Sequence, residues 1–290
     1  MIIANIKPSQ LTLSDLRYFS AKMGMMTDTL QIKGLITGTV RDFTASNFSF
    51  SFKDSTNFLG TIKMRGLPKF KDTHIVGNIE KFNFTYQDIS EFAIPNHDGK
   101  IPLPKQITCV KEAMLSGEFY GFFNNFNTKF NLHTNIGNVF FNGALNNNLL
   151  LAPKPYYFLK AHANNVKLGE VLDLDDDLVA TMMLEVSGEG LAKKDVDLEM
   201  SLDIEKLFAL NKEFKDLYVV ADMENQRIIT SSNINSNILN AELNALLDVS
   251  KKEPSFDVKL DLKKADLYKL GLVKKDETMI LSTKLNANLR

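Results

Sequence analysis

Residues 194–204, KDVDLEMSLDI, show the pattern that decides the fold of this chain. Apolar residues occupy every second position of the stretch, and acidic or polar residues occupy the positions between them. Successive side chains of an extended strand point to opposite faces, so one face of this strand is apolar and the other is polar. The same alternation recurs in residues 47–53 and 255–263. The pattern therefore predicts β-strands that bury only one face.

The composition excludes some classes of protein. The chain has 290 residues, with 34 basic and 35 acidic side chains and a formal net charge of -1. It lacks the basic field that wraps nucleic acid, so no nucleic-acid partner is expected. Cys109 is the only cysteine, which excludes an internal disulfide framework.

The two ends of the sequence suggest a piece of a longer protein. No run of about 18 apolar residues is present, and the start, MIIANIKP, lacks the basic and apolar regions of a signal peptide. The final residues, 281–290, have a strand pattern without a turn or cap. We expect a middle segment whose membrane anchor lies outside this sequence and whose sheet edges continue in the parent protein.

Strand patterns cover most of the chain. About fourteen strands are expected, because alternating segments are separated by Asn-, Gly- and Pro-rich turns. The expected ranges are 30–40, 45–53, 57–65, 73–86, 113–123, 126–134, 137–145, 156–166, 177–191, 195–204, 214–225, 226–233, 238–249, 255–266 and 277–289.

Helical signals are few and short. Residues 8–20 carry cap candidates and near-helical apolar spacing, and alternation lapses at 86–92, 205–210 and 266–270. Residues 92–106 contain three prolines, too many for a central strand, and are expected to form a loop. Three segments, beginning at residues 77, 160 and 260, resemble one another, which suggests an elongated architecture built by addition of strand groups.

No set of residues supports catalysis or metal binding. The four histidines are scattered without metal-ligand spacing, and residues 173–177 lack the glycine and glutamate of a calcium loop. Cys109 lies among apolar residues without a nearby histidine, which is typical of an inert thiol. The sequence indicates a protein that is not an enzyme and needs no cofactor.

The apolar faces of these strands need a partner. No long amphipathic helix is available to cover them, so the sheet must bury its apolar face against itself or against a ligand. One solution is a β-sandwich or barrel, and a β-sandwich or solenoid would act only as a structural or adhesion module. The other is a long, curled, open sheet, because open sheets of more than about ten strands tend to curl.

The sequence resembles the AsmA-like family and, within it, the TamB-like proteins of bacteria with two membranes. The resemblance covers the chain from about residue 30 and rests on a loose β repeat of the form apolar-x-Gly-x-apolar-x-Gly. It is carried by LQIKGLITGTVRDFTASNF from residue 30, by TIKMRGLP from residue 61 with the nearby DTHI and GNI, and by LDLKKADL from residue 260.

The resemblance implies an all-β fold: a long antiparallel, curled open sheet, a β-groove, with a few short helices. It implies a non-enzymatic periplasmic protein, tethered to the inner membrane, whose groove conducts phospholipids toward the outer membrane. The implied partners are phospholipid acyl chains and an outer-membrane assembly protein of the BamA or TamA type. A role in outer-membrane protein assembly without lipid transfer is the alternative within this family.

This interpretation divides the chain and names the groove lining. The expected segments are a short helical opening (1–29), a first β-groove segment (30–92), a loop with a second segment (93–155) and a third segment (156–290). The expected lipid-lining residues are the apolar members of the clearest alternating strands: Phe48, Phe50, Phe52, Phe130, Leu132, Phe141, Val196, Leu198, Met200, Phe256, Val258 and Leu260.

Overall fold

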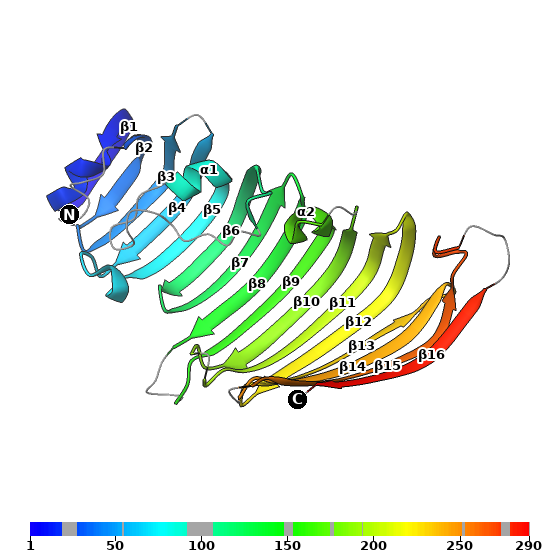
Figure 1. Cartoon of the computed structure of the whole chain (residues 1–290). Helices are drawn as coiled ribbons and strands as arrows, with labels where there is room; N and C mark the ends of the chain where they lie inside the picture. The colour runs from blue at the N-terminus through cyan, green and yellow to red at the C-terminus, as the bar shows by residue number, and fades with distance from the viewer. Residues whose placement is uncertain are drawn as a thin grey trace. The chain divides into compact units, whose positions relative to one another are not determined.

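The chain folds as one long meander of antiparallel strands (Figure 1). The computed structural model describes residues 1–18, 28–53, 55–91, 107–147, 153–174, 177–192, 194–250, 253–273 and 279–289. Sixteen strands follow the order β1 to β16 without a crossover, and β1 and β16 are the two edge strands. The predicted all-β fold with an open antiparallel sheet is therefore confirmed.

The strands are nine to thirteen residues long. They are β1 (Ile2–Thr12), β2 (Thr29–Gly38), β3 (Asp42–Phe52), β4 (Thr56–Arg65), β5 (His74–Thr85), β6 (Glu112–Phe122), β7 (Asn125–Thr134), β8 (Gly137–Asn146), β9 (Tyr156–Lys167), β10 (Val179–Glu189), β11 (Asp197–Ala209), β12 (Lys212–Glu224), β13 (Arg227–Asn235), β14 (Leu239–Asp248), β15 (Ser255–Asp266) and β16 (Ile280–Leu289).

Short helical pieces occupy some of the connections. Two are 3-10 helices, η1 (Leu13–Tyr18) and η3 (Phe70–Asp72), and two are α-helices, α1 (Tyr86–Glu91) and α2 (Leu168–Leu172). Because successive hairpins of a meander alternate between the two ends of the strands, η1, α1 and α2 follow β1, β5 and β9 at the same end. We call this the helical end and the other the opposite end.

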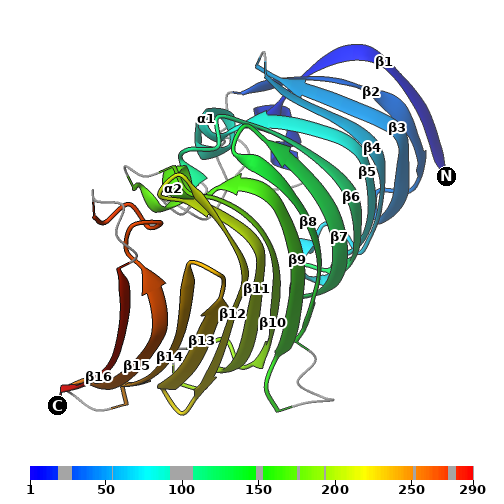
Figure 2. The same ribbon diagram turned by 90° about the vertical axis from the view of Figure 1, so that its right-hand side faces the viewer.

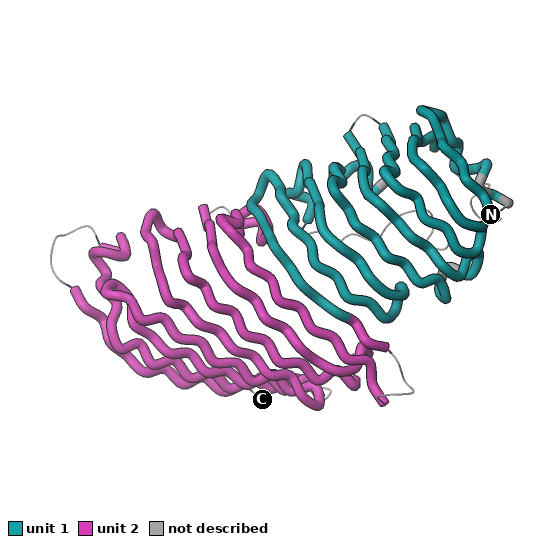
Figure 3. The backbone as a smooth tube through the Cα atoms, turned by 180° about the vertical axis from the view of Figure 1, so that it is seen from behind, with its two compact units in different colours: residues 1–144 teal, residues 145–290 magenta. Residues whose placement is uncertain are grey.

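The chain divides into two compact units, Met1–Ala144 and Leu145–Arg290 (Figure 3). We call them unit 1 and unit 2 and describe each by itself. The boundary falls within β8, inside the segment 93–155 of the division expected from the sequence. The strands of each unit are curved along their length (Figure 2).

Tight hairpins set the register in unit 2. The two-residue turns Leu210–Asn211 and Asn225–Gln226 have positive φ at both positions, between 51° and 63°. This is the type I′ geometry, whose twist matches that of the flanking strands. β11 and β12 therefore pair without a shift from Leu198 opposite Met223 to Ala209 opposite Lys212.

The opening segment differs from the helical segment expected for residues 1–29. Residues 2–12 form the edge strand β1, and only η1 follows as a helical piece, before the undescribed residues 19–27. Proline is tolerated at an edge bulge because it need not donate to the ladder. Pro8 lies at such a place, where the register shifts between Ile6 and Ser9.

Two other helix predictions were wrong and one is confirmed. Residues 205–209 continue β11, because Leu207 pairs with Phe214 and Lys206 with Lys215. Residues 267–271 form a turn, not a helix. The helix expected at 86–92 is α1, and the loop expected at 92–106 lies outside the described residues.

The three similar segments occupy equivalent positions in the meander. They form β5, β9 and β15, and each strand has a register shift before its last residues. Each strand then leads into a helical piece or turn at the helical end: α1, α2 and residues 267–271. The loose sequence repeat therefore corresponds to a repeated strand, bulge and helical turn.

Candidate functional site

The apolar face of unit 2 consists of four rows of residues that run across seven strands. Directly paired residues of neighbouring strands share a face, so the register assigns each row. The rows from β9 to β15 are Tyr157–Gly188–Leu198–Met223–Ile228–Leu247–Phe256, Leu159–Val186–Met200–Ala221–Thr230–Ala245–Val258, Ala161–Leu184–Leu202–Val219–Ser232–Leu243–Leu260 and Ala163–Met182–Ile204–Leu217–Ile234–Ala241–Leu262.

None of these 28 positions carries a charged residue. Polar groups are confined to the phenol of Tyr157 and the hydroxyls of Thr230 and Ser232. Thr230 Oγ1 already donates to the Val220 carbonyl oxygen at 2.9 Å. The surface is therefore apolar and nearly free of directional hydrogen-bonding groups.

The opposite face of unit 2 carries the charges. Lys160 Nζ lies 2.9 Å from Glu185 Oε1 and Lys284 Nζ lies 3.0 Å from Asp261 Oδ2, each pair across neighbouring strands. Lys263, from the β15 bulge, also pairs with Glu242. These side chains are 33% to 79% exposed, so the charges lie in solvent on one face and the four rows of the other face carry none.

Large apolar side chains of the unit 2 apolar face remain accessible. The exposed fractions of Leu243, Phe256 and Leu285 are 36%, 39% and 54%. Leu198, Met200 and most other members are half-buried. The described residues provide no second layer over this face, so an apolar surface stays accessible on one side of a single sheet.

The apolar face of unit 1 is built differently, from aromatic rings and glycines. Phe50 and Phe58 are cross-strand partners whose rings stack with centroids 5.1 Å apart, and Phe82 lies 6.0 Å from Phe58. The ring centroids of Phe48 and Phe50 are 6.4 Å apart. These rings join β3, β4 and β5 into one aromatic cluster.

Glycines on the same face make room for these rings. A Cβ at Gly117 would lie 2.8 Å from Phe130 Cδ1 and one at Gly34 would lie 3.2 Å from Phe48 Cδ2. Glycine accepts such close approach because it has no side chain. Phe58 on this face is 7% exposed, whereas its neighbour Leu59 on the other face is 39% exposed. At these positions the aromatic face, meaning the apolar face of unit 1, is therefore the more buried of the two.

Polar and charged groups gather at the helical end of unit 1. Thr56 Oγ1 donates to Asp88 Oδ2 of α1 at 2.8 Å, and Lys53 Nζ lies 3.9 Å from Asp88 Oδ1. Lys53 Nζ also lies 5.1 Å from the centre of the Phe52 ring. Because Thr56 and Phe52 belong to the aromatic face, α1 places ionic groups at one margin of the apolar surface.

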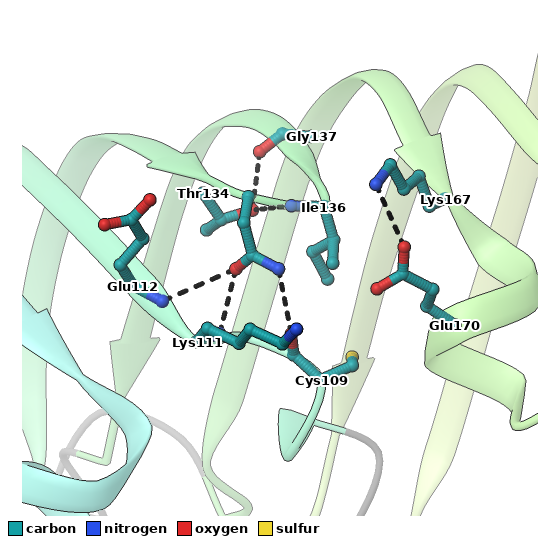
Figure 4. Close-up of polar contacts among 9 residues, drawn as sticks. Cys109, Lys111, Glu112, Thr134, Ile136, Gly137, Lys167 and Glu170 are labelled. Atoms are coloured by element: carbon teal, nitrogen blue, oxygen red, sulfur yellow. Dashed lines mark hydrogen bonds and ion pairs between the residues drawn. The ribbon is translucent and has the colours of Figure 1, made fainter.

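A side-chain clamp holds the β7–β8 hairpin at the same end (Figure 4). Asn135 Oδ1 accepts from the Lys111 amide at 2.8 Å, and Asn135 Nδ2 donates to the Cys109 carbonyl oxygen at 3.0 Å. Thr134 Oγ1 donates to the Gly137 carbonyl oxygen at 2.7 Å. Within unit 2, Lys167 pairs with Glu170 of α2 at 3.0 Å (Figure 4). These contacts fix the strand ends and are structural.

A buried acid, Asp248, joins two neighbouring strands at the opposite end of unit 2. Hydrogen bonds from the Ser250 hydroxyl and amide, together with the neighbouring Arg227, lower the pKa of Asp248 to about 2. Arg227 Nε donates to Asp248 Oδ2 at 3.1 Å, and the Asp248 side chain is 5% exposed. This carboxylate ties β13 to β14 at the margin of the apolar rows.

The sequence-predicted lining residues fall into two groups. In unit 1, Phe48, Phe50 and Phe52 lie on β3, Phe130 and Leu132 on β7, and Phe141 on β8, where its ring centre is 5.5 Å from that of Phe130. In unit 2, Leu198 shares a row with Phe256 and Met200 shares a row with Val258, while Leu260 lies in the next row. Val196 precedes β11 and lies outside the rows.

Several members of these faces were not singled out from the sequence. Phe58, Phe82 and Phe119 belong to the unit 1 face, and Met223 and Ile228 to the unit 2 face. Bulges hide some of them, because the register shift in β5 between Ile79 and Phe82 changes the alternation. The sequence signal that could have identified these residues is the apolar–polar alternation on each side of the bulge, read separately for the two parts of the strand.

Comparisons with known proteins identify no relative. No protein-family model, no curated protein and no solved structure matches the chain. Among the described residues, none of the helices is long and apolar enough to cross a membrane. The same part of the chain contains no group of three or more residues that could hold a metal ion.

Proposed function

We propose that this chain is a lipid-conducting segment of a TamB-like or AsmA-like protein, with phospholipid acyl chains as its ligand. The observation that carries the proposal is the apolar face of unit 2, where four uncharged rows cross seven strands and stay accessible. Exposed apolar surfaces of this extent mark interaction sites for lipid or protein.

The dimensions of this face suit acyl chains. Its outermost rows are six residues apart along each strand, which is roughly 20 Å at about 3.3 Å per residue. One leaflet of a bilayer has a hydrocarbon thickness of about 15 Å, half of the whole core. An acyl chain of ordinary length therefore fits between the two margins of the strands.

The chemistry of the face favours sliding over docking. Burial of each CH₂ group stabilises the bound chain by about 0.8 kcal/mol without directional contacts. The uncharged rows give an acyl chain similar surroundings at each strand. Charged headgroups would remain in water at the strand ends, because a charge buried beside hydrocarbon costs several kcal/mol.

The proposal includes the cellular setting that the family resemblance implies. The segment acts in the periplasm, tethered to the inner membrane in the parent protein, and supports transport of phospholipid between the two membranes. An outer-membrane assembly protein of the BamA or TamA type is the proposed protein partner. The long open antiparallel meander is consistent with this family's β-groove.

Site-specific crosslinking tests the proposal. A photoreactive residue at position 198 points to the apolar face, and one at position 199 points to the opposite face of the same strand. Positions 130 and 129 on β7 provide the same pair in unit 1. After incubation with radiolabelled phospholipid vesicles, strong adducts are expected at 198 and 130, and background at 199 and 129.

Other results would select another function. Equal labelling within each pair, or none at any position, would contradict lipid conduction. Protein adducts at 198 and 130 in cell extracts without lipid adducts would favour an assembly factor or structural module whose apolar faces contact protein.

A further inference from the structure

The opposite end of unit 1 brings together three connections between its strands. Residues 39–41, 66–73 and 123–124 follow β2, β4 and β6, so they lie at the same end of the meander, at the lower end of unit 1 in Figure 1. They lie two strands apart, which spaces them by roughly 10 Å. We call these three connections, with the adjoining residues Asp42, Arg65, His74, Tyr120 and Phe122, the basic end of unit 1.

Large apolar side chains are exposed at this end. Phe123 at the β6–β7 turn is 67% exposed and Val40 at the β2–β3 turn is 48% exposed. Tyr120 and Phe122 are 57% and 37% exposed, and the His74 ring packs edge-to-face against both, with centroids 4.8 and 5.1 Å away. Tyrosine is enriched at membrane–water interfaces, and phenylalanine is typical of the face that surface-bound segments bury in the membrane.

Cations surround these apolar side chains. Arg41, Lys69 and Lys71 are exposed and form no ion pair with any described residue. Arg65 pairs with Asp42 at 3.0 Å, and Asp72 is the remaining acid of this end. Four cations against two carboxylates leave an excess of two positive charges, and the first three cations lie on the same connections as Val40 and the residues of η3.

We propose that the basic end of unit 1 binds the surface of an anionic membrane. Two effects stabilise apolar turn tips flanked by cations at such a surface: burial of the apolar side chains at the headgroup boundary and attraction of the cations to anionic headgroups. A nucleic acid would leave Val40 and Phe123 in water. This contact is separate from the apolar faces and would hold the strand ends, where headgroups lie, against a bilayer.

A single tryptophan tests this inference directly. The chain contains no tryptophan, so Phe123→Trp in the full chain introduces a single tryptophan, whose emission can be excited selectively over that of the seven tyrosines. Vesicles of phosphatidylcholine with about one third phosphatidylglycerol should shift its emission to shorter wavelength, as insertion removes the indole from water. Vesicles of phosphatidylcholine alone should cause little shift.

Charge removal separates this site from other lipid contacts. Each cation near an anionic surface contributes about fivefold to partitioning, so Arg41→Gln, Lys69→Gln and Lys71→Gln together should lower the partition coefficient about a hundredfold. Leu210→Trp is the matched control, because Leu210 is a turn tip that is 55% exposed and the charges of its hairpin end balance. Three cations (Lys206, Lys212 and Lys215) stand against three acids (Glu205, Glu213 and Asp216), and Lys215 pairs with Glu213 at 3.0 Å. The emission of the Leu210→Trp variant should not change with either vesicle.

The outcomes distinguish this inference from lipid conduction. No shift at position 123, an equal shift with neutral vesicles or an unchanged partition coefficient after charge removal would each overturn membrane binding by this end. Capture of an acidic protein or of nucleic acid in place of vesicles would overturn it as well. If membrane binding by this end fails but lipid conduction holds, position 198 still gives lipid adducts while position 123 shows no shift specific to anionic vesicles. If lipid conduction fails, position 198 gives no adducts, whatever the result at position 123.

Discussion

Units 1 and 2 build an apolar sheet face from different side chains. Unit 1 contains 17 of the 21 phenylalanines and 11 of the 15 glycines, and its face combines stacked rings with glycines beneath them. Unit 2 holds the other four of each, and its face consists mainly of Leu, Met, Val, Ile and Ala. The same strand alternation therefore supports two kinds of surface.

The difference has a mechanical consequence. Aromatic rings that stack on one another and fill the space over glycines fix each other's positions, so the unit 1 face is packed even without a second layer. Aliphatic rows make fewer specific contacts within the sheet, and their side chains stay half-exposed. Unit 1 should therefore depend on its apolar face for stability more than unit 2 does.

The largest expected effect is at Gly117, beneath the Phe130 ring. Its φ is +141° and a Cβ would lie 2.0 Å from the Lys129 carbonyl oxygen, so Gly117→Ala combines backbone strain with a clash. We expect a loss of about 4 kcal/mol in the free energy of unfolding, measured by urea denaturation.

Gly77 is the matched control on the same face. Its Cβ would meet only Phe119 Cβ, at 3.8 Å, which is ordinary contact. Gly77→Ala should leave stability unchanged or raise it by up to about 1 kcal/mol. Equal losses of unfolding free energy in the two variants would contradict the inference that Gly117 leaves room for the Phe130 ring.

A smaller effect compares one ring with one aliphatic side chain. Phe58→Ala removes the centre of the unit 1 aromatic cluster and should cost about 3 kcal/mol. Leu202→Ala in unit 2 removes a half-buried side chain and should cost about 1.5 kcal/mol. Denaturant titrations of both variants test this order, and a larger loss for Leu202→Ala would mean that the unit 2 face is covered in solution.

Most strands could be predicted from the sequence, because apolar and polar residues alternate along a strand wherever no bulge interrupts it. The ranges expected for β6, β7 and β8 differ from the observed bounds by one residue at most. Residues 205–209 were misjudged because Glu205-Lys206 breaks the alternation, although it only marks the register shift between β10 and β11. β1 was missed because Pro8 and Ser14 suggested a helix start.

The candidate faces were less predictable than the strands. The sequence identifies which residues of one strand share a face, but a row requires the register between strands, which hairpin geometry and bulges decide. Phe50 and Phe58 become partners only because the turn after β3 sets that register. Close approach of Phe130 to Gly117 likewise depends on β6 and β7 meeting at those positions.

A further expected effect concerns acid sensitivity at the margin of the unit 2 face. Asp248 has a pKa lowered to about 2, mainly by the Ser250 hydroxyl and amide and then by Arg227. An unfolded aspartate has a pKa of about 3.9, so the folded state favours the carboxylate and gains stability from it above about pH 4. That contribution is lost as the pH falls from about 4 to about 2.

Replacement of this carboxylate by an amide tests the origin of the acid sensitivity. Asp248→Asn removes the contribution at every pH, so denaturation at pH ~6 should show a less stable variant, and the difference from wild type should disappear by about pH 2. Gln226→Ala, at the adjoining turn, should leave the pH dependence unchanged. If the Asp248→Asn variant differed from wild type by a constant amount between these two pH values, the substitution would have altered packing alone. The Ser250 and Arg227 contacts would then not favour the charged form of the acid.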